Sequence, residues 1–182
     1  MSRWETASRL QTNVTAETVW KTAYADAKAW PRWNAEIEHA TLVEPLALGA
    51  KARIKFRSGL RLRFHVVEYE EGRLFTDEAH LPGARMGHCH LIESAGEGLI
   101  TLTNTIYIEG PLAPLWRRIL GPAAARTLPE AQAAVVEVAR AALVGEEKAT
   151  TGIEPVQLPS RSNAGLPLPP FWGQGWLPIS RI

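Results

Sequence analysis

The order of the predicted elements is typical of an α+β domain, in which a first strand and two short helices precede a run of antiparallel strands and a long C-terminal helix. Three observations lead to this prediction. Apolar and polar residues alternate through much of residues 40–110, and glycine-containing turns divide that segment. An apolar stripe with helical spacing follows in residues 111–144. We expect about seven antiparallel strands, with helix covering one face of the sheet and water the other.

The composition is that of an ordinary globular chain without bulk charge. Its 182 residues suffice for one domain with a sizeable core, and a net charge of +1 gives no general attraction to nucleic acid or anionic membranes. A single cysteine excludes an intramolecular disulfide and a cysteine-based zinc cage. The N-terminal MSRWETASRL lacks an apolar signal region, and no stretch approaches the roughly 18 apolar residues of a membrane span. We therefore expect a cytoplasmic protein without membrane insertion.

The beginning of the chain predicts one strand and two short helices. Residues 3–12 are expected to form the strand. Thr15 suits the N-cap of a helix over residues 16–24. A second helical piece contains AWPRWN (29–34), and Pro31 limits its length.

The strand region begins at 40–45 and is divided by four turn signals, which are Ser58-Gly59, Glu71-Gly72, Pro82-Gly83 and Gly96-Glu97-Gly98. Alternation places one set of residues on the inner face, namely Ala52, Ile54, Phe56, Leu62, Phe64, Val66, Ile100, Leu102, Asn104, Ile106 and Ile108. Basic residues occupy the outer face beside the first turn, where Lys55 is expected to face Arg63. Acidic side chains such as Asp77 or Glu93 are expected to relieve this repulsion, and an anionic partner is the alternative.

The stretch ARMGHCHLIE (84–93) has two histidines on one face of a strand and the only cysteine, Cys89, on the other. If residues 94–98 form a five-residue hairpin loop, His88 lies opposite Asn104 on the inner face. A four-residue loop would turn both histidines outward. No third metal ligand is evident on the inner face, so we predict no metal site.

The C-terminal helix is expected over residues 111–144, where Pro122 and Pro129 should kink it or split off its first turns. Residues 145–182 are rich in proline and glycine and predict a separate tail, which also carries three aromatic residues, Phe171, Trp172 and Trp176. The domain boundaries are therefore predicted as 1–144 and 145–182.

This order of elements is that of the helix-grip fold, and three segments carry a family resemblance. They are TAETVWKTAYADAKAWPRWNAEI (15–37), FTDEAHLPGARMGHCHLIESAGEG (75–98) and IEGPLAPLWRRILG (108–121). The chain resembles the polyketide cyclase/dehydrase and lipid-transport family of the SRPBCC superfamily, which also holds START domains and the birch-pollen-allergen fold. The resemblance covers roughly residues 3–144. It implies a curved sheet wrapped around the C-terminal helix, with a cavity for hydrophobic or aromatic ligands between them.

Three hypotheses for function follow. The first is a carrier or binding protein for a small hydrophobic ligand, and the second is a cofactor-free cyclase or dehydratase. The third is an interaction module that acts through the basic face or the aromatic tail. We expect His88 and Asn104 as catalytic candidates, and as ligand-binding candidates His90, Met86, Leu102, Ile106, Phe64, Ile54, Trp30 and Trp33. No cofactor is expected, and a homodimer and an acyl carrier protein stay open as partners.

Overall fold

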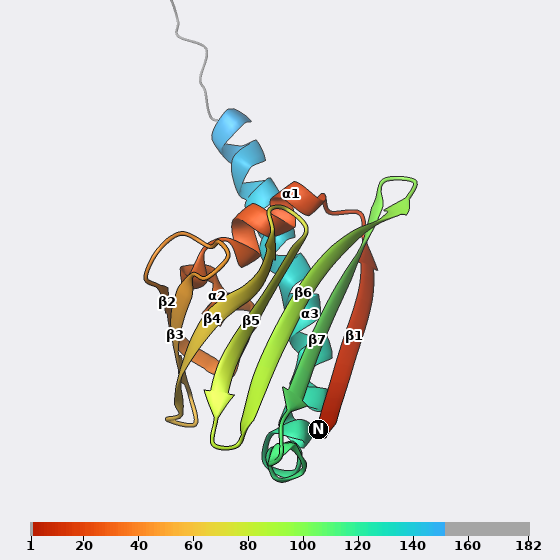
Figure 1. The fold of residues 1–182 in the computed structure, drawn as a ribbon. Helices are drawn as coiled ribbons and strands as arrows, with labels where there is room; N and C mark the ends of the chain where they lie inside the picture. Colours follow the sequence, from red (N-terminus) through yellow and green to blue (C-terminus); the bar gives the residue numbers. More distant parts are fainter. Residues whose placement is uncertain (1, 152–182) are drawn as a thin grey trace, which may run out of the picture. The chain divides into compact units, whose positions relative to one another are not determined.

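The fold is one antiparallel sheet of seven strands with a long helix across its inner face (Figure 1). A computed structural model describes residues 2–151 of the chain. The strand order is β1-β7-β6-β5-β4-β3-β2. The strands are β1 (Arg3–Thr12), β2 (Ile37–Leu42), β3 (Lys51–Phe56), β4 (Arg61–Glu70), β5 (Leu74–Leu81), β6 (Ala84–Gly96) and β7 (Leu99–Glu109). The curved sheet, the helix α3 (Ala113–Thr151) and the short helices after β1 confirm the predicted helix-grip fold.

The short helices begin where the sequence predicts. Thr15 caps α1 (Ala16–Val19), because its side-chain oxygen accepts a hydrogen bond from the Thr18 amide at 3.2 Å. The chain continues directly into a π-helical turn, η1 (Trp20–Tyr24), and a 3₁₀ turn, η2 (Ala27–Ala29), follows after two residues. The helix α2 (Trp30–Trp33) follows, with a proline in its first turn where a missing amide costs nothing.

Two indole rings fix these helices to one another. The Trp30 Nε1 donates to the Tyr24 carbonyl at 3.0 Å, and the Trp33 Nε1 donates to the Ala23 carbonyl at 2.8 Å. Both tryptophans are buried, so each ring fills the core while its one polar atom is satisfied. Their apolar surfaces are left to face the sheet.

The β6–β7 hairpin differs from the predicted register by two residues. His90, not His88, lies opposite Asn104, and His88 lies opposite Ile106. The reason is a tighter turn at Glu97-Gly98, where both residues have positive φ, combined with a bulge between Ser94 and Gly96. A shift of two residues preserves the face, so both histidines point inward as expected.

The β3–β4 hairpin shows a similar shift. The Phe56 amide bonds to the Leu60 carbonyl at 2.8 Å, so Lys55 faces Arg61 and Arg53 faces Arg63. The expected pairing of Lys55 with Arg63 was therefore wrong, although the basic row does lie on the outer face. Lys55 forms an ion pair with Glu38 of β2, with 2.5 Å between Nζ and Oε1.

Pro122 and Pro129 were expected to kink the helix or to split off its first turns, and the split does not occur, because α3 is continuous over Ala113–Thr151. Both prolines are on the exposed side of the helix, where water can satisfy the carbonyl groups that lose an amide partner. The buried stripe contains Leu128, Ala131, Val135 and Val138, and α3 packs chiefly on β1 and β7. The helix runs past residue 144, and the rest of the predicted tail, with Phe171, Trp172 and Trp176, lies outside the described residues. No helix within residues 2–151 is both long and apolar enough to cross a membrane.

Candidate functional site

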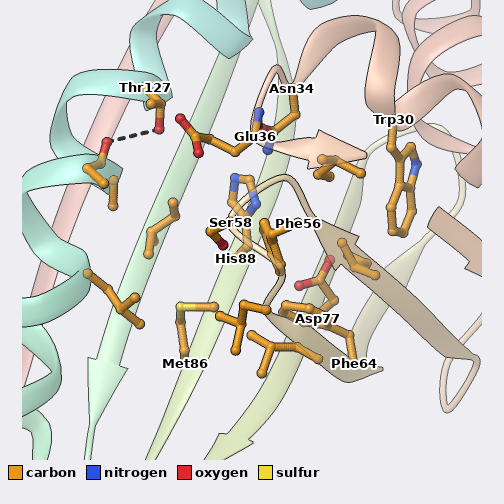
Figure 2. A pocket seen from close by; sticks show the side chains of 18 of the residues that line it. Trp30, Asn34, Glu36, Phe56, Ser58, Phe64, Asp77, Met86, His88 and Thr127 are labelled. Atoms are coloured by element: carbon orange, nitrogen blue, oxygen red, sulfur yellow. Dashed lines mark hydrogen bonds between the residues drawn. The ribbon is translucent and has the colours of Figure 1, made fainter. Parts of the chain in front are cut away.

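A cavity of about 290 Å³ lies between the inner face of the sheet, α2 and α3. Figure 2 shows its lining side chains directed into a common space. Most of the wall is apolar, and its larger members are Trp30, Trp33, Ile37, Ile54, Phe56, Leu60, Leu62, Phe64, Phe75, Met86, Ile106, Ile108 and Leu120. Helix α3 rests on β1 and β7, so the space opens over the other half of the sheet, where the tryptophans of α2 cover it.

Eight of the ten site residues expected from the sequence line this cavity: Ile54, Phe64, Met86, His88, His90, Ile106, Trp30 and Trp33. Leu102 and Asn104 do not, although both are fully buried. Gln132 of α3 donates to the Leu102 carbonyl at 2.5 Å, and Tyr24 donates to Asn104 Oδ1 at 3.4 Å. Helix α3 and η1 therefore cover this part of β7, and Asn104 presents no surface to the cavity.

The two histidines form part of an aromatic stack in the cavity wall. Their ring centroids are 3.9 Å apart, and the His90 ring stacks on Phe75 at 4.3 Å with an interplanar angle of 13°. Neither His88 Nε2 nor His90 Nδ1 has a hydrogen-bond partner among the described residues. The imidazoles are thus held by packing and retain unused hydrogen-bonding capacity.

Burial keeps both histidines uncharged near neutral pH. Loss of solvation lowers the pKa of His88 to about 4. The pKa of His90 is also lowered, by burial first and then by His88, while the neighbouring Asn104 opposes the shift. A neutral imidazole has one nitrogen that can donate a hydrogen bond and one that can accept one, so His88 offers the cavity an uncharged polar group.

Asp77 is a buried polar residue of the wall that the sequence interpretation missed. It lies on β5 directly opposite His88, only 5% exposed, and lines the cavity (Figure 2). Its carboxyl group makes no hydrogen bond or ion pair within residues 2–151, and burial raises its pKa to about 7. The expectation that Asp77 relieves the outer basic row was wrong. The alternation Phe75-x-Asp77-x-Ala79-x-Leu81, with three apolar members, is the signal that could have placed it inward.

The neighbouring Glu78 shows the contrast between the two faces of β5. Its side chain is also buried but points outward, where it accepts a hydrogen bond from the Tyr107 hydroxyl and lies 3.7 Å from an Arg85 guanidinium nitrogen. A buried carboxylate with such partners is an ordinary structural element. Asp77 has none, so its ionised form has no partner to compensate for burial.

The mouth of the cavity is more polar than its floor. Asn34, Glu36, Ser58 and Thr127 lie there, and Figure 2 shows Glu36 reaching toward α3. The Glu36 side chain is 45% exposed and its carboxylate lies 3.9 Å from an Arg126 nitrogen. Among the described residues that line the cavity there is no lysine or arginine, and the acidic ones are Glu36 and Asp77.

Within the described part of the chain, no group of three histidine, cysteine, aspartate or glutamate side chains could hold a metal ion. Cys89 lies on β6 between the two histidines and pairs with Thr76 and Thr105 on the face away from the cavity. Burial raises the pKa of its thiol, which therefore stays protonated.

Comparison with known proteins agrees with this architecture. The model of the family described as polyketide cyclase / dehydrase and lipid transport matches residues 3–144. The chain belongs to this family. No curated protein matches it in sequence.

Similar solved structures share the fold at low sequence identity. Norcoclaurine synthase from Thalictrum flavum, in complex with dopamine and hydroxybenzaldehyde, superposes with a TM-score of 0.60 at 13% identity, over 79% of this chain and 88% of that one. The hypothetical protein jhp0584 from Helicobacter pylori has a TM-score of 0.62 at 11% identity, over 74% and 87%. The di-domain aromatase/cyclase BexL from the BE-7585A biosynthetic pathway has a TM-score of 0.57 at 14% identity, over 72% and 46%. At these identities the likeness establishes the fold.

The raised pKa of Asp77 generates a prediction about stability. Asp77→Asn should increase the free energy of unfolding at pH 8, because the carboxyl of Asp77 is ionised there in both states, and burial makes its ionisation costly only in the native state. The difference between a pKa of about 7 and the ordinary 3.8 limits the gain to about 4 kcal/mol. Wild type loses this stability as pH rises from about 4 to 7, so the gain should vanish below pH 4.

Urea unfolding from pH 4 to pH 8 measures this difference. Glu93→Gln, at an exposed position on β6, is the control and should show no comparable gain. Equal stability of wild type and Asp77→Asn at pH 8 would contradict the buried, unpartnered carboxyl.

Proposed function

We propose that the chain binds a small, largely apolar ligand with an aromatic or polyketide-like skeleton inside the cavity. The observation that carries the proposal is an apolar wall with one polar spot, formed by Asp77 and His88. Ligand sites are typically concave, lined by apolar and aromatic side chains, and fitted with a few polar groups that set orientation. Membership of a family described by cyclisation, dehydration and lipid transport supports the same class of ligand.

The aromatic side chains give the ligand a surface to pack on. Trp30 and Phe75 lie nearly parallel, with ring centroids 6.3 Å apart and an interplanar angle of 15°, and both border the cavity. Burial of a ligand against them would release about 25 cal/mol for each Å² of apolar surface removed from water. Affinity in this account comes from apolar contact, and orientation comes from the polar spot.

Filling the cavity should abolish binding. Ile106 faces inward from β7 and lines the cavity, so a tryptophan at this position would fill part of the space. We expect Ile106→Trp to weaken binding of the neutral fluorescent probe N-phenyl-1-naphthylamine at least about tenfold, which corresponds to about 1.4 kcal/mol. Fluorescence titration measures the dissociation constant. The matched control is Ile119→Trp on α3, where the side chain is 56% exposed and outside the cavity. The proposal fails if wild type does not bind the probe, or if both variants bind it alike.

A cyclase or dehydratase is the second candidate, favoured by the pairing of a neutral acid with a neutral base. His88 would take a proton from a carbon atom next to a ketone, and the resulting carbanion would attack a distant carbonyl carbon of the same chain. Asp77 would donate its proton to the alkoxide oxygen as the carbon–carbon bond forms. Transfer of the proton from His88 to Asp77 resets the pair, and a second such cycle expels the hydroxyl group as water.

Heptane-2,4,6-trione provides a minimal test, because aldol closure and loss of one water convert it to the aromatic orcinol. Wild type should accelerate this conversion, and His88→Ala should remove the acceleration while N-phenyl-1-naphthylamine still binds. Product formation is followed by chromatography. A carrier predicts the opposite, namely binding without turnover and indifference to His88→Ala. Acceleration that survives His88→Ala would contradict the assigned base.

The surface proposed for an acidic partner is the outer side of the sheet, away from the cavity. Arg53 and Arg63 face each other on the outer side of the sheet, and neither has an ion-pair partner in the part of the chain that the structure describes. An acidic partner such as an acyl carrier protein would complement this row. That partner and a homodimer stay predictions.

A further inference from the structure

We propose that the cavity accepts ligands whose polar group is uncharged, a ketone or a phenol, and rejects carboxylates such as free fatty acids. This inference rests on the proposed function and names the chemistry of the ligand. It follows from which charged groups line the cavity, where they lie, and what the wall offers as hydrogen-bonding partners.

The titratable groups that face the cavity are two carboxyl groups, Asp77 and Glu36, and two imidazoles, His88 and His90. The elements packed around Asp77 add no positive charge. Strand β4 contributes apolar side chains, and α2 contributes indole rings. Helix α3 presents Leu120, Ala123, Ala124 and Thr127. Arg126 forms an ion pair with Glu36, and its side chain is 67% exposed.

An anionic ligand therefore has no partner in this cavity. A carboxylate would lose its hydration on entry and find no lysine or arginine to replace it. It would also approach Asp77, so that two carboxyl groups would share one apolar space and one of them would have to take up a proton. Both effects oppose binding in the same direction.

A cationic ligand is disfavoured by the behaviour of His88. This imidazole lies across the strand pair from Asp77, yet burial lowers its pKa to about 4. The site thus resists a positive charge even beside its own carboxyl group. Because the pKa of Asp77 is raised and that of His88 is lowered, the pair is most stable with both groups neutral.

The neutral pair has hydrogen-bonding capacity that matches a ketone or phenol. A protonated Asp77 donates one hydrogen bond, which a ligand oxygen can accept. The imidazole of His88 lines the cavity and can serve as donor or acceptor. One carbonyl or hydroxyl oxygen placed between them would satisfy groups that otherwise lack partners.

Three naphthalene derivatives of the same skeleton test the inference, namely 2-naphthol, 2-naphthoate and 2-naphthylmethylammonium. Isothermal titration calorimetry at pH 7 should show 2-naphthol binding at least about tenfold more tightly than either ion, a difference of about 1.4 kcal/mol. Binding of 2-naphthol selects the protonated form of Asp77, so it should take up protons at pH 7. Its affinity should then fall as pH rises above about 7, the pKa of the free carboxyl.

Two variants separate Asp77 from the other titratable groups. Asp77→Asn keeps a neutral donor of the same shape, so it should bind 2-naphthol without proton uptake and without loss of affinity up to pH 8.5. Glu93→Gln changes an exposed carboxyl on the outer face and should keep the wild-type pH profile.

The outcomes distinguish this inference from the proposed function. If N-phenyl-1-naphthylamine binds but 2-naphthoate binds as tightly as 2-naphthol, only the ligand assignment fails. Tightest binding of the ammonium would make Asp77 a counter-ion and would overturn the assignment. Proton uptake that persists in Asp77→Asn would overturn it as well. If neither the probe nor any naphthalene derivative binds, the proposed function and this inference fail together.

Discussion

The antiparallel pairing of β5 with β6 sets a carboxyl group and an imidazole opposite each other on the concave side of the sheet. Neither group has a charged partner within residues 2–151 to compensate for burial, so the surroundings shift each toward its neutral form. The site consequently works as a hydrogen-bonding spot in an apolar wall. Its selectivity, and any acid–base chemistry, depend on that neutrality.

The rest of the fold creates the space around this pair. Helix α3 packs on β1 and β7, where Gln132 and the buried stripe close the core. Over β3 to β6 the helix leaves a space, and Trp30 and Trp33 of the short helix α2 cover this space. Each indole nitrogen is tied to a backbone carbonyl of η1, which fixes the rings that form the roof. The same contacts that stabilise the domain therefore define the shape of the cavity.

The sequence predicted the fold well because its signals are periodic. Alternation along β3, β4 and β7 identified the inner face, and the capping of α1 by Thr15 followed from local chemistry. Register was harder, because the tight turn at Glu97-Gly98 and the bulge at Ser94/Gly96 together move the pairs by two residues without any signal in composition. The predicted face of the two histidines was right, but the predicted cross-strand partner was wrong, because Asn104 lies opposite His90 and not His88.

Asp77 is a residue of the site whose inward position the sequence analysis did not predict. An aspartate on a strand is expected to face water, and the outer basic row offered it an apparent reason to do so. Its inward position follows from apolar neighbours at Phe75, Ala79 and Leu81, and polar residues in a buried row are informative because they are rare. The predicted split of α3 at its prolines was wrong, because the effect of a proline depends on which side of the helix it occupies.

The measurement that tests the central claim most directly is an NMR titration of the side-chain carboxyl carbon of Asp77, with the resonance assigned by its loss in Asp77→Asn. The account predicts a midpoint near pH 7 in the free protein and a higher one when 2-naphthol is bound. A midpoint below pH 5 in the free protein would contradict it, because the carboxyl would then be ionised and compensated at neutral pH.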